Sequence, residues 1–164
     1  MKNRLTRRSL LAAPFALARP GYRYEFPRDH FAHPDFRTEW WYYTGNLFTR
    51  ERRRFGFELT FFRQAFERDD AAPAVWNADP VWLAHLALSD IEGNRFLHTE
   101  RLNRSGPGLA GADAQRGLVW NGNWSAGANR LRAITDDFTL DLKVRSTKPP
   151  VIHGMNGVSQ KAAG

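Results

Sequence analysis

Three ionisable residues in otherwise apolar segments could perform acid–base chemistry. Glu39 opens EWWYY, Glu58 lies within RFGFELTFFR, and His85 lies within VWLAHLALSD. A carboxylic acid in an apolar pocket can stay protonated near neutral pH and could then act as a general acid. We therefore predict Glu39, Glu58 and His85 as catalytic candidates. The alternatives are a structural ion pair of either glutamate with Arg37 or Arg63, and a hydrogen-bonded core or surface role for the histidine.

Four consecutive aromatic residues, WWYY at 40–43, suggest an apolar binding surface. In an extended strand, alternate side chains face opposite sides, so both faces of this segment would be aromatic and covered. Aromatic faces also attract cations. We expect an aromatic-lined cleft for an extended apolar molecule. The predicted ligand-binding residues are Trp40, Trp41, Tyr42, Tyr43, Phe57, Trp82, His153 and Asn156.

The segment KPPVIHGMNG contributes the last two of these residues. Its paired prolines favour an extended chain, and its glycines permit unusual backbone angles. His153 and Asn156 could thus be held at a fixed place near a domain junction. A rigid interdomain linker is the alternative interpretation.

Other chemistries have less support in the sequence. His30, His33, Asp35 and Glu39 offer metal-ligand atoms at short spacing, but they fall in a proline-rich stretch without a helix to align them. We expect no metal and no cofactor. The sequence has no cysteine, which excludes a thiolate site, and no G-x-S-x-G motif for a serine nucleophile.

Alternating apolar residues and hairpin turns predict an all-β protein. We expect a loop or short helix over 64–80 and a glycine-rich loop over 105–116. A meandering antiparallel sheet of this length would remove its exposed edges by closing into a barrel. The predicted strands are 39–48, 54–63, 81–90, 95–104, 117–126 with a break at Gly122, 129–135 and 137–146.

The first eighteen residues predict an export signal. They combine four basic residues, no acid, a short apolar stretch and an A-x-A site at 16–18, and TRRSLL resembles a twin-arginine motif. We expect a periplasmic or secreted protein; the alternative is a basic amphipathic terminus that stays attached. The formal net charge is +7, much of it in this segment, so we expect no nucleic-acid partner and at most peripheral membrane contact.

Several segments together closely resemble the AttH-like, lipocalin-like family, which includes carotenoid 1,2-hydratase (hydroxyneurosporene synthase) and many relatives labelled predicted secreted hydrolases. The segments are FPRDHFAHPDFRTEWWYYTGNL, RRFGFELTFFRQAF, WLAHLALSD, GLAGA and KPPVIHGMNGVSQKAAG. The resemblance implies a lipocalin-like antiparallel up-and-down β-barrel over 19–147, incomplete or open if the chain is truncated. Residues 148–164 would form a junction toward a second lipocalin-like domain.

The resemblance also bears on function. It implies an N-terminal domain that binds an extended apolar small molecule, such as an isoprenoid or lipid. The full-length protein would then add water to a carbon–carbon double bond, through a carbocation that aromatic faces stabilise, or hydrolyse its ligand, in either case without a cofactor. The residues thought to act in the hydratases belong mainly to the second half, so we expect this chain alone to be inactive. The alternatives are a non-enzymatic periplasmic lipid or pigment carrier and a purely structural half that packs on its partner domain.

Overall fold

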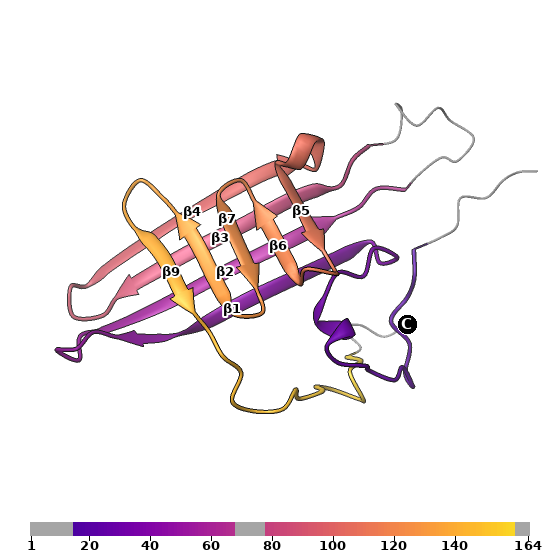
Figure 1. The fold of residues 1–164 in the computed structure, drawn as a ribbon, viewed down its shortest axis with the longest axis horizontal. Helices are drawn as coiled ribbons and strands as arrows, with labels where there is room; N and C mark the ends of the chain where they lie inside the picture. The colour runs from indigo at the N-terminus through magenta and orange to yellow at the C-terminus, as the bar shows by residue number, and fades with distance from the viewer. Residues whose placement is uncertain (1–14, 68–77, 160–164) are drawn as a thin grey trace, which may run out of the picture.

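The computed structural model describes residues 15–67 and 78–159, and these form two antiparallel sheets with almost no helix (Figure 1). The all-β prediction is confirmed. The first sheet has the order β1-β2-β3-β4 and the second β5-β6-β7-β8-β9. The strands are β1 (Thr38–Phe48), β2 (Arg54–Gln64), β3 (Val81–Asp90), β4 (Arg95–Arg104), β5 (Ala110–Asp113), β6 (Leu118–Asn121), β7 (Trp124–Gly127), β8 (Arg130–Ile134) and β9 (Thr139–Lys143).

The long strands of the first sheet follow the period of two in their sequences. β1 pairs with β2 so that Trp41 lies opposite Phe61 and Trp40 opposite Phe62. Because side chains alternate between the faces of a strand, Trp41 and Phe61 point to the second sheet, while Trp40 and Phe62 lie on the outer face. The β1–β2 hairpin closes where Arg52 takes a positive φ of 66°.

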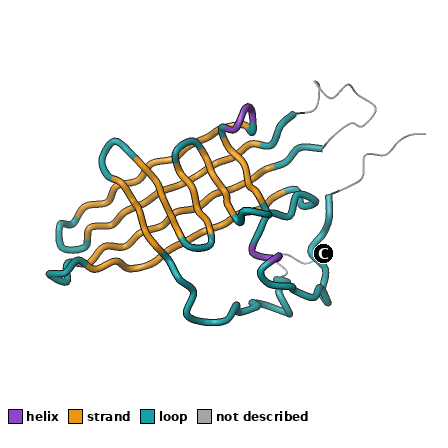
Figure 2. Tube along the Cα trace, in the orientation of Figure 1, coloured by secondary structure: helices purple, strands orange, loops and turns teal. Residues whose placement is uncertain are grey.

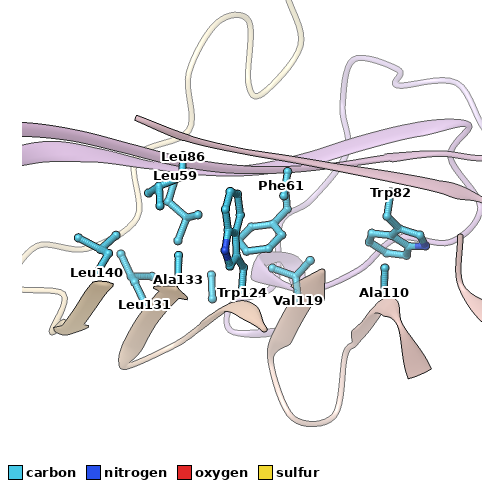
Figure 3. Close-up of a cluster of buried hydrophobic side chains, with 12 residues drawn as sticks. Leu59, Phe61, Trp82, Leu86, Ala110, Val119, Trp124, Leu131, Ala133 and Leu140 are labelled. Atoms are coloured by element: carbon cyan, nitrogen blue, oxygen red, sulfur yellow. The ribbon is translucent and has the colours of Figure 1, made fainter. Parts of the chain in front are cut away.

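The five short strands cross over one face of the long strands (Figures 1 and 2). Buried side chains from both sheets meet between the two layers. Figure 3 shows Trp124 beside Phe61 near the middle of this core, with Trp82 over Ala110 toward one end. The core residues are Leu59, Phe61, Trp82, Ala84, Leu86, Ala110, Val119, Trp124, Ala126, Leu131, Ala133 and Leu140.

The predicted barrel is supported only in part. The first sheet is an up-and-down meander, and so is the second. Two such meanders are compatible with a lipocalin-like barrel. Within the described residues, however, no strand of one sheet pairs with a strand of the other, so closure of the barrel stays a prediction.

The structure agrees with one expected irregularity and changes another element. The predicted strand 117–126 is broken at Gly122 as expected: β6 and β7 are joined there by a tight turn at which Gly122 has a φ of +60°. The predicted glycine-rich loop 105–116 contains a short 3-10 helix, η3 (Gly106–Gly108), and the strand β5. β5 forms because its backbone pairs with β6. Its small residues have little preference for a strand and did not predict it.

The segment before β1 and the segment after β9 lie side by side at one end of the molecule (Figure 1). The lead-in contains a short 3-10 helix, η1 (Arg28–His30). The Tyr24 hydroxyl donates a hydrogen bond to the Gly157 carbonyl at 3.3 Å, and the Asn156 amide donates to the Tyr22 carbonyl at 3.4 Å. These contacts place the KPPVIHGMNG segment against the lead-in.

Two sequence predictions fall largely outside the described residues. They are the export signal over 1–18, of which only 15–18 are described, and the element over 64–80, of which 68–77 are not described. Within the described part of the chain, no helix has the length and apolar character needed to cross a membrane.

Candidate functional site

The three predicted acid–base residues do not meet in one site. Glu39 lies on the face of the first sheet that packs toward the second sheet, whereas Glu58 and His85 lie on the outer face. The Glu58 carboxylate accepts a hydrogen bond from the Thr60 hydroxyl at 3.0 Å. His85 Nε2 lies 3.3 Å from the Glu100 carboxylate across the β3–β4 pair.

The eight predicted ligand-binding residues also divide into groups. Four of them, Trp41, Tyr43, Phe57 and Trp82, belong to or pack against the core between the sheets. Trp41 and Trp82 stack there with ring centroids 6.2 Å apart. These four side chains therefore contribute to folding, and their contact with a ligand stays a prediction.

The other four lie on the surface. Trp40 and Tyr42 are 58% and 63% exposed on the outer face of the first sheet. His153 and Asn156 lie in the segment after β9 that packs on the lead-in. The aromatic segment thus serves two surfaces: its odd-numbered residues pack in the core and its even-numbered residues remain exposed.

A cavity of about 540 Å³ lies between the lead-in, the start of β1 and the end of the described chain. Its volume falls within the usual range for small-molecule sites. Its wall is mainly apolar, with aromatic residues from two separate segments. The lining residues are Leu17, Ala18, Arg19, Pro20, Gly21, Tyr22, Tyr24, His33, Phe36, Thr38, Glu39, Trp40 and Val158.

A hydrogen-bonded network beside this cavity fixes the lead-in to the sheet. Glu39 accepts hydrogen bonds from the His33 backbone amide at 2.9 Å and lies 3.3 Å from Arg63 Nη2. Arg63, buried on β2, also donates to the carbonyls of His33 and Phe36 at 2.9 and 2.8 Å. The structure therefore shows the Glu39–Arg63 ion pair that the sequence left open as an alternative.

Asp29 on η1 adds a second carboxylate to this region. Its side chain is almost fully covered, and it accepts hydrogen bonds from Arg28, from the Glu25 amide and from the Tyr22 hydroxyl. The hydrogen bond from the Arg28 guanidinium holds the pKa of Asp29 well below its usual value, although burial opposes this shift. Asp29 thus remains a carboxylate close to His33, with 3.6 Å between Asp29 Oδ1 and His33 Nε2.

His33 lines the cavity and lies between these two carboxylates. The sequence suggested His33 only as a possible metal ligand, and this placement was not predicted, because its partner Glu39 belongs to the following strand. The stretch HPDFRTE over 33–39, with His33, Phe36 and Glu39 at the cavity, has no periodic pattern. In the described residues, no group of three or more metal-ligating side chains is placed to hold a metal ion.

The outer face of the first sheet presents a second group of chemically distinct residues. One row across the sheet contains Trp40, Phe62, Leu83 and Leu102, and the next contains Tyr42, Thr60, His85 and Glu100. Phe96 and Leu102 on β4 are 66% and 67% exposed. An apolar strip therefore lies beside a polar strip on this face. Trp40, at one end of the apolar strip, also lines the cavity.

Comparisons with known proteins identify the family of this chain. No curated protein matches the chain. A crystal structure of a protein from Nitrosomonas europaea, provisionally assigned as AttH, matches it with a TM-score of 0.79 and 34% sequence identity, over 92% of this chain and 46% of that one. The chain thus spans less than half the length of this relative. The AttH-like family model matches residues 17–164. With both its fold and its sequence matched over nearly the whole chain, this protein belongs to the AttH-like family.

Proposed function

We propose that this chain binds an extended apolar molecule, such as an isoprenoid or a lipid, in the cavity beside the start of β1. The observation that carries the proposal is the cavity of about 540 Å³ with aromatic walls. Trp40, Phe36, Tyr22 and Tyr24 line it, and burying such side chains against an apolar ligand is favourable.

Of the eight predicted ligand-binding residues, Trp40 lines this cavity. Trp41, Tyr43, Phe57 and Trp82 belong to or pack against the core instead. A space of only about 50 Å³ lies near Trp41 and Tyr43. The cavity at the rim is large enough for a ligand without disturbing that packing.

The proposal includes an exported protein whose full-length form adds water to its ligand or hydrolyses it. Cleavage after Ala18 would remove Leu17 and Ala18 from the cavity wall, while its four aromatic residues, all beyond residue 18, would remain in the chain. Glu58 and His85 stay candidate acid–base groups on the outer face. The alternative is a periplasmic carrier that binds the same class of molecule and leaves it unchanged.

Ligand retention tests the proposal. The purified chain would be extracted with organic solvent for mass spectrometry, and farnesol would be titrated while tryptophan fluorescence is followed. We expect a co-purifying apolar molecule or saturable farnesol binding. Trp40→Ala should weaken farnesol binding by about tenfold or more, because it removes one aromatic wall.

Phe96→Ala is the matched control for Trp40→Ala. It removes a similarly exposed aromatic ring of the same sheet, and this ring does not line the cavity. Equal loss of farnesol binding in both variants would contradict the rim cavity as the binding place.

A second candidate function is supported by the outer face of the first sheet. Trp40, Tyr42, Phe96 and Leu102 are all well exposed there, as expected for a surface that packs on another domain or protein. A folded chain that binds no farnesol, and that associates with itself less after Phe96→Ala, would favour this structural role.

A further inference from the structure

The His33 imidazole is held in one orientation by the residue that follows it into the sheet. His33 Nδ1 lies 2.8 Å from Glu39 Oε1, and the His33 backbone amide donates to the same carboxylate at 2.9 and 3.0 Å. Three contacts between two residues fix both the backbone and the ring. Glu39 is itself positioned by Arg63, 3.3 Å from its other oxygen.

This arrangement determines which ring nitrogen is available for chemistry. A carboxylate accepts hydrogen bonds, so the proton of the neutral ring lies on Nδ1 and Nε2 carries the lone pair. Nε2 is 3.6 Å from Asp29 Oδ1, which is too long for a hydrogen bond although it would be an ion-pair distance in the protonated ring, so Nε2 of the neutral ring has no hydrogen-bond donor there. A base oriented by a carboxylate through its other nitrogen is the arrangement found in many hydrolytic sites.

We propose that His33, positioned by Glu39, is a general base that hydrolyses an ester of an apolar acid bound in the rim cavity. The inference rests on the proposed function, because the acyl chain would occupy the same aromatic-walled space. His33, Glu39 and Trp40 all line that cavity. The conformation of the lead-in thus places a base beside an apolar binding surface.

The chemistry of the imidazole selects the ester over an alkene. Hydration of an isolated double bond requires a strong acid, and an imidazolium is a far weaker acid than a carboxylic acid. Activation of water by a neutral imidazole suits attack on a carbonyl carbon. Arg19 also lines the cavity, and its positive charge would stabilise the oxyanion that forms.

The reaction is balanced without any further reactant. His33 Nε2 takes a proton from water as the water oxygen bonds to the ester carbonyl carbon. The tetrahedral oxyanion then collapses and breaks the bond to the alkoxy oxygen, which leaves with the bonding electron pair. The imidazolium returns its proton to the leaving oxygen or to solvent, and the new carboxylic acid loses its proton to solvent.

The variant His33→Asn separates the structural role of this residue from the chemical one. The asparagine amide nitrogen takes the place of Nδ1 and can still donate to Glu39, but nothing replaces Nε2. The matched control is His98→Asn on β4, an exposed histidine that stacks on Phe96 and does not line the cavity.

The probe is p-nitrophenyl octanoate, with release of p-nitrophenolate followed for the whole chain. We expect hydrolysis above the buffer rate in the wild type and in His98→Asn. In His33→Asn we expect kcat to fall by about 100-fold or more with farnesol binding retained, because a general base contributes about that factor. Farnesol should inhibit the wild-type reaction by competition.

Three outcomes would overturn the inference. They are wild-type hydrolysis no faster than buffer, equal hydrolysis by His33→Asn, and hydrolysis that farnesol does not inhibit. The first and third need no variant, so poor folding of His33→Asn would leave the inference testable. Farnesol binding without hydrolysis would overturn only the catalytic inference, whereas absence of farnesol binding would overturn the proposed function.

Discussion

Tyr43 shows how one residue of the aromatic segment responds to its surroundings. Its side chain packs against the core, and this burial raises the pKa of the phenol above its ordinary value of 10.0. The folded state therefore holds the phenol proton more tightly than the unfolded state does. The resulting contribution to stability is fully present below about pH 10 and is lost as the pH rises toward the folded-state pKa.

Replacing Tyr43 by Phe should remove this alkaline sensitivity. Above pH 10, we expect the unfolding free energy of the wild type to fall relative to Tyr43→Phe, by at most about 1.4 kcal/mol per pH unit. Urea denaturation between pH 8 and 11 would measure it. Tyr42→Phe removes an exposed phenol from the neighbouring position and is the control. A constant difference between wild type and Tyr43→Phe across this range would show that Tyr43 is not sheltered from water.

The sequence was sufficient to separate the two faces of the aromatic segment, but not to find the partners of Glu39. Strict alternation placed Trp41 and Tyr43 opposite to Trp40 and Tyr42, as the structure shows. Glu39 is bound by His33 in an irregular lead-in and by Arg63 on the next strand. Such contacts depend on the path of a loop, which has no periodicity from which to predict it.

At the scale of elements, β5 depends on one close contact with its neighbour. The Trp120 indole lies directly over Gly111, and a Cβ atom at Gly111 would come within 2.7 Å of the ring. The ring cannot shift freely, because its Nε1 donates a hydrogen bond to the Gly108 carbonyl at 2.9 Å. Glycine is therefore required here by packing rather than by backbone angle.

Gly111→Ala should destabilise the protein by about 1 kcal/mol or more, because either the ring or the strand must move. Gly56→Ala is the matched control, since Gly56 also lies within a strand and its Cβ would meet Ser89 at an ordinary 3.7 Å. Chemical denaturation of both variants measures the difference. Equal stability of the two would show that Trp120 can leave Gly111 at little cost.

The sequence predicted the four long strands well but did not predict β5. The strands 81–90 and 95–104 match their predicted bounds, because alternating apolar residues identify the first and the turn at Glu92-Gly93-Asn94 precedes the second. AGAD has neither branched nor aromatic side chains, so the strand preference of its own residues is weak. Its conformation comes from the partner strand and from the ring that packs on it.

For the whole molecule, the feature that local patterns could not give is the crossing of the two sheets. The sequence predicted the inward residues of most strands, but the layering depends on which strands share a sheet. Arg101 of β4 illustrates this dependence: its guanidinium lies 4.7 Å from the centroid of the Trp124 ring on β7 and donates to the Ile134 carbonyl. Contacts between the two sheets thus join their buried side chains into a single core.

If the layers share one core, damage to either sheet should destabilise both. Leu131 on β8 is fully buried against the first sheet, and Figure 3 shows it in the cluster beside Ala133 and below Leu59. Leu131→Ala should lower the unfolding free energy by about 2–5 kcal/mol, the usual cost of emptying such a site. Leu102→Ala, at a position 67% exposed on the outer face, should change it little.

Cooperativity is tested by two signals in the same denaturation experiment. Tryptophan fluorescence reports on the core, where Trp82 and Trp124 contact residues of both layers, and far-UV circular dichroism reports on all strands. In Leu131→Ala both curves should move to lower denaturant and still coincide, because neither meander retains a covered apolar face without the other. Two separate transitions would mean that the long-stranded sheet keeps its structure alone, and the core would then be an interface between two independent units.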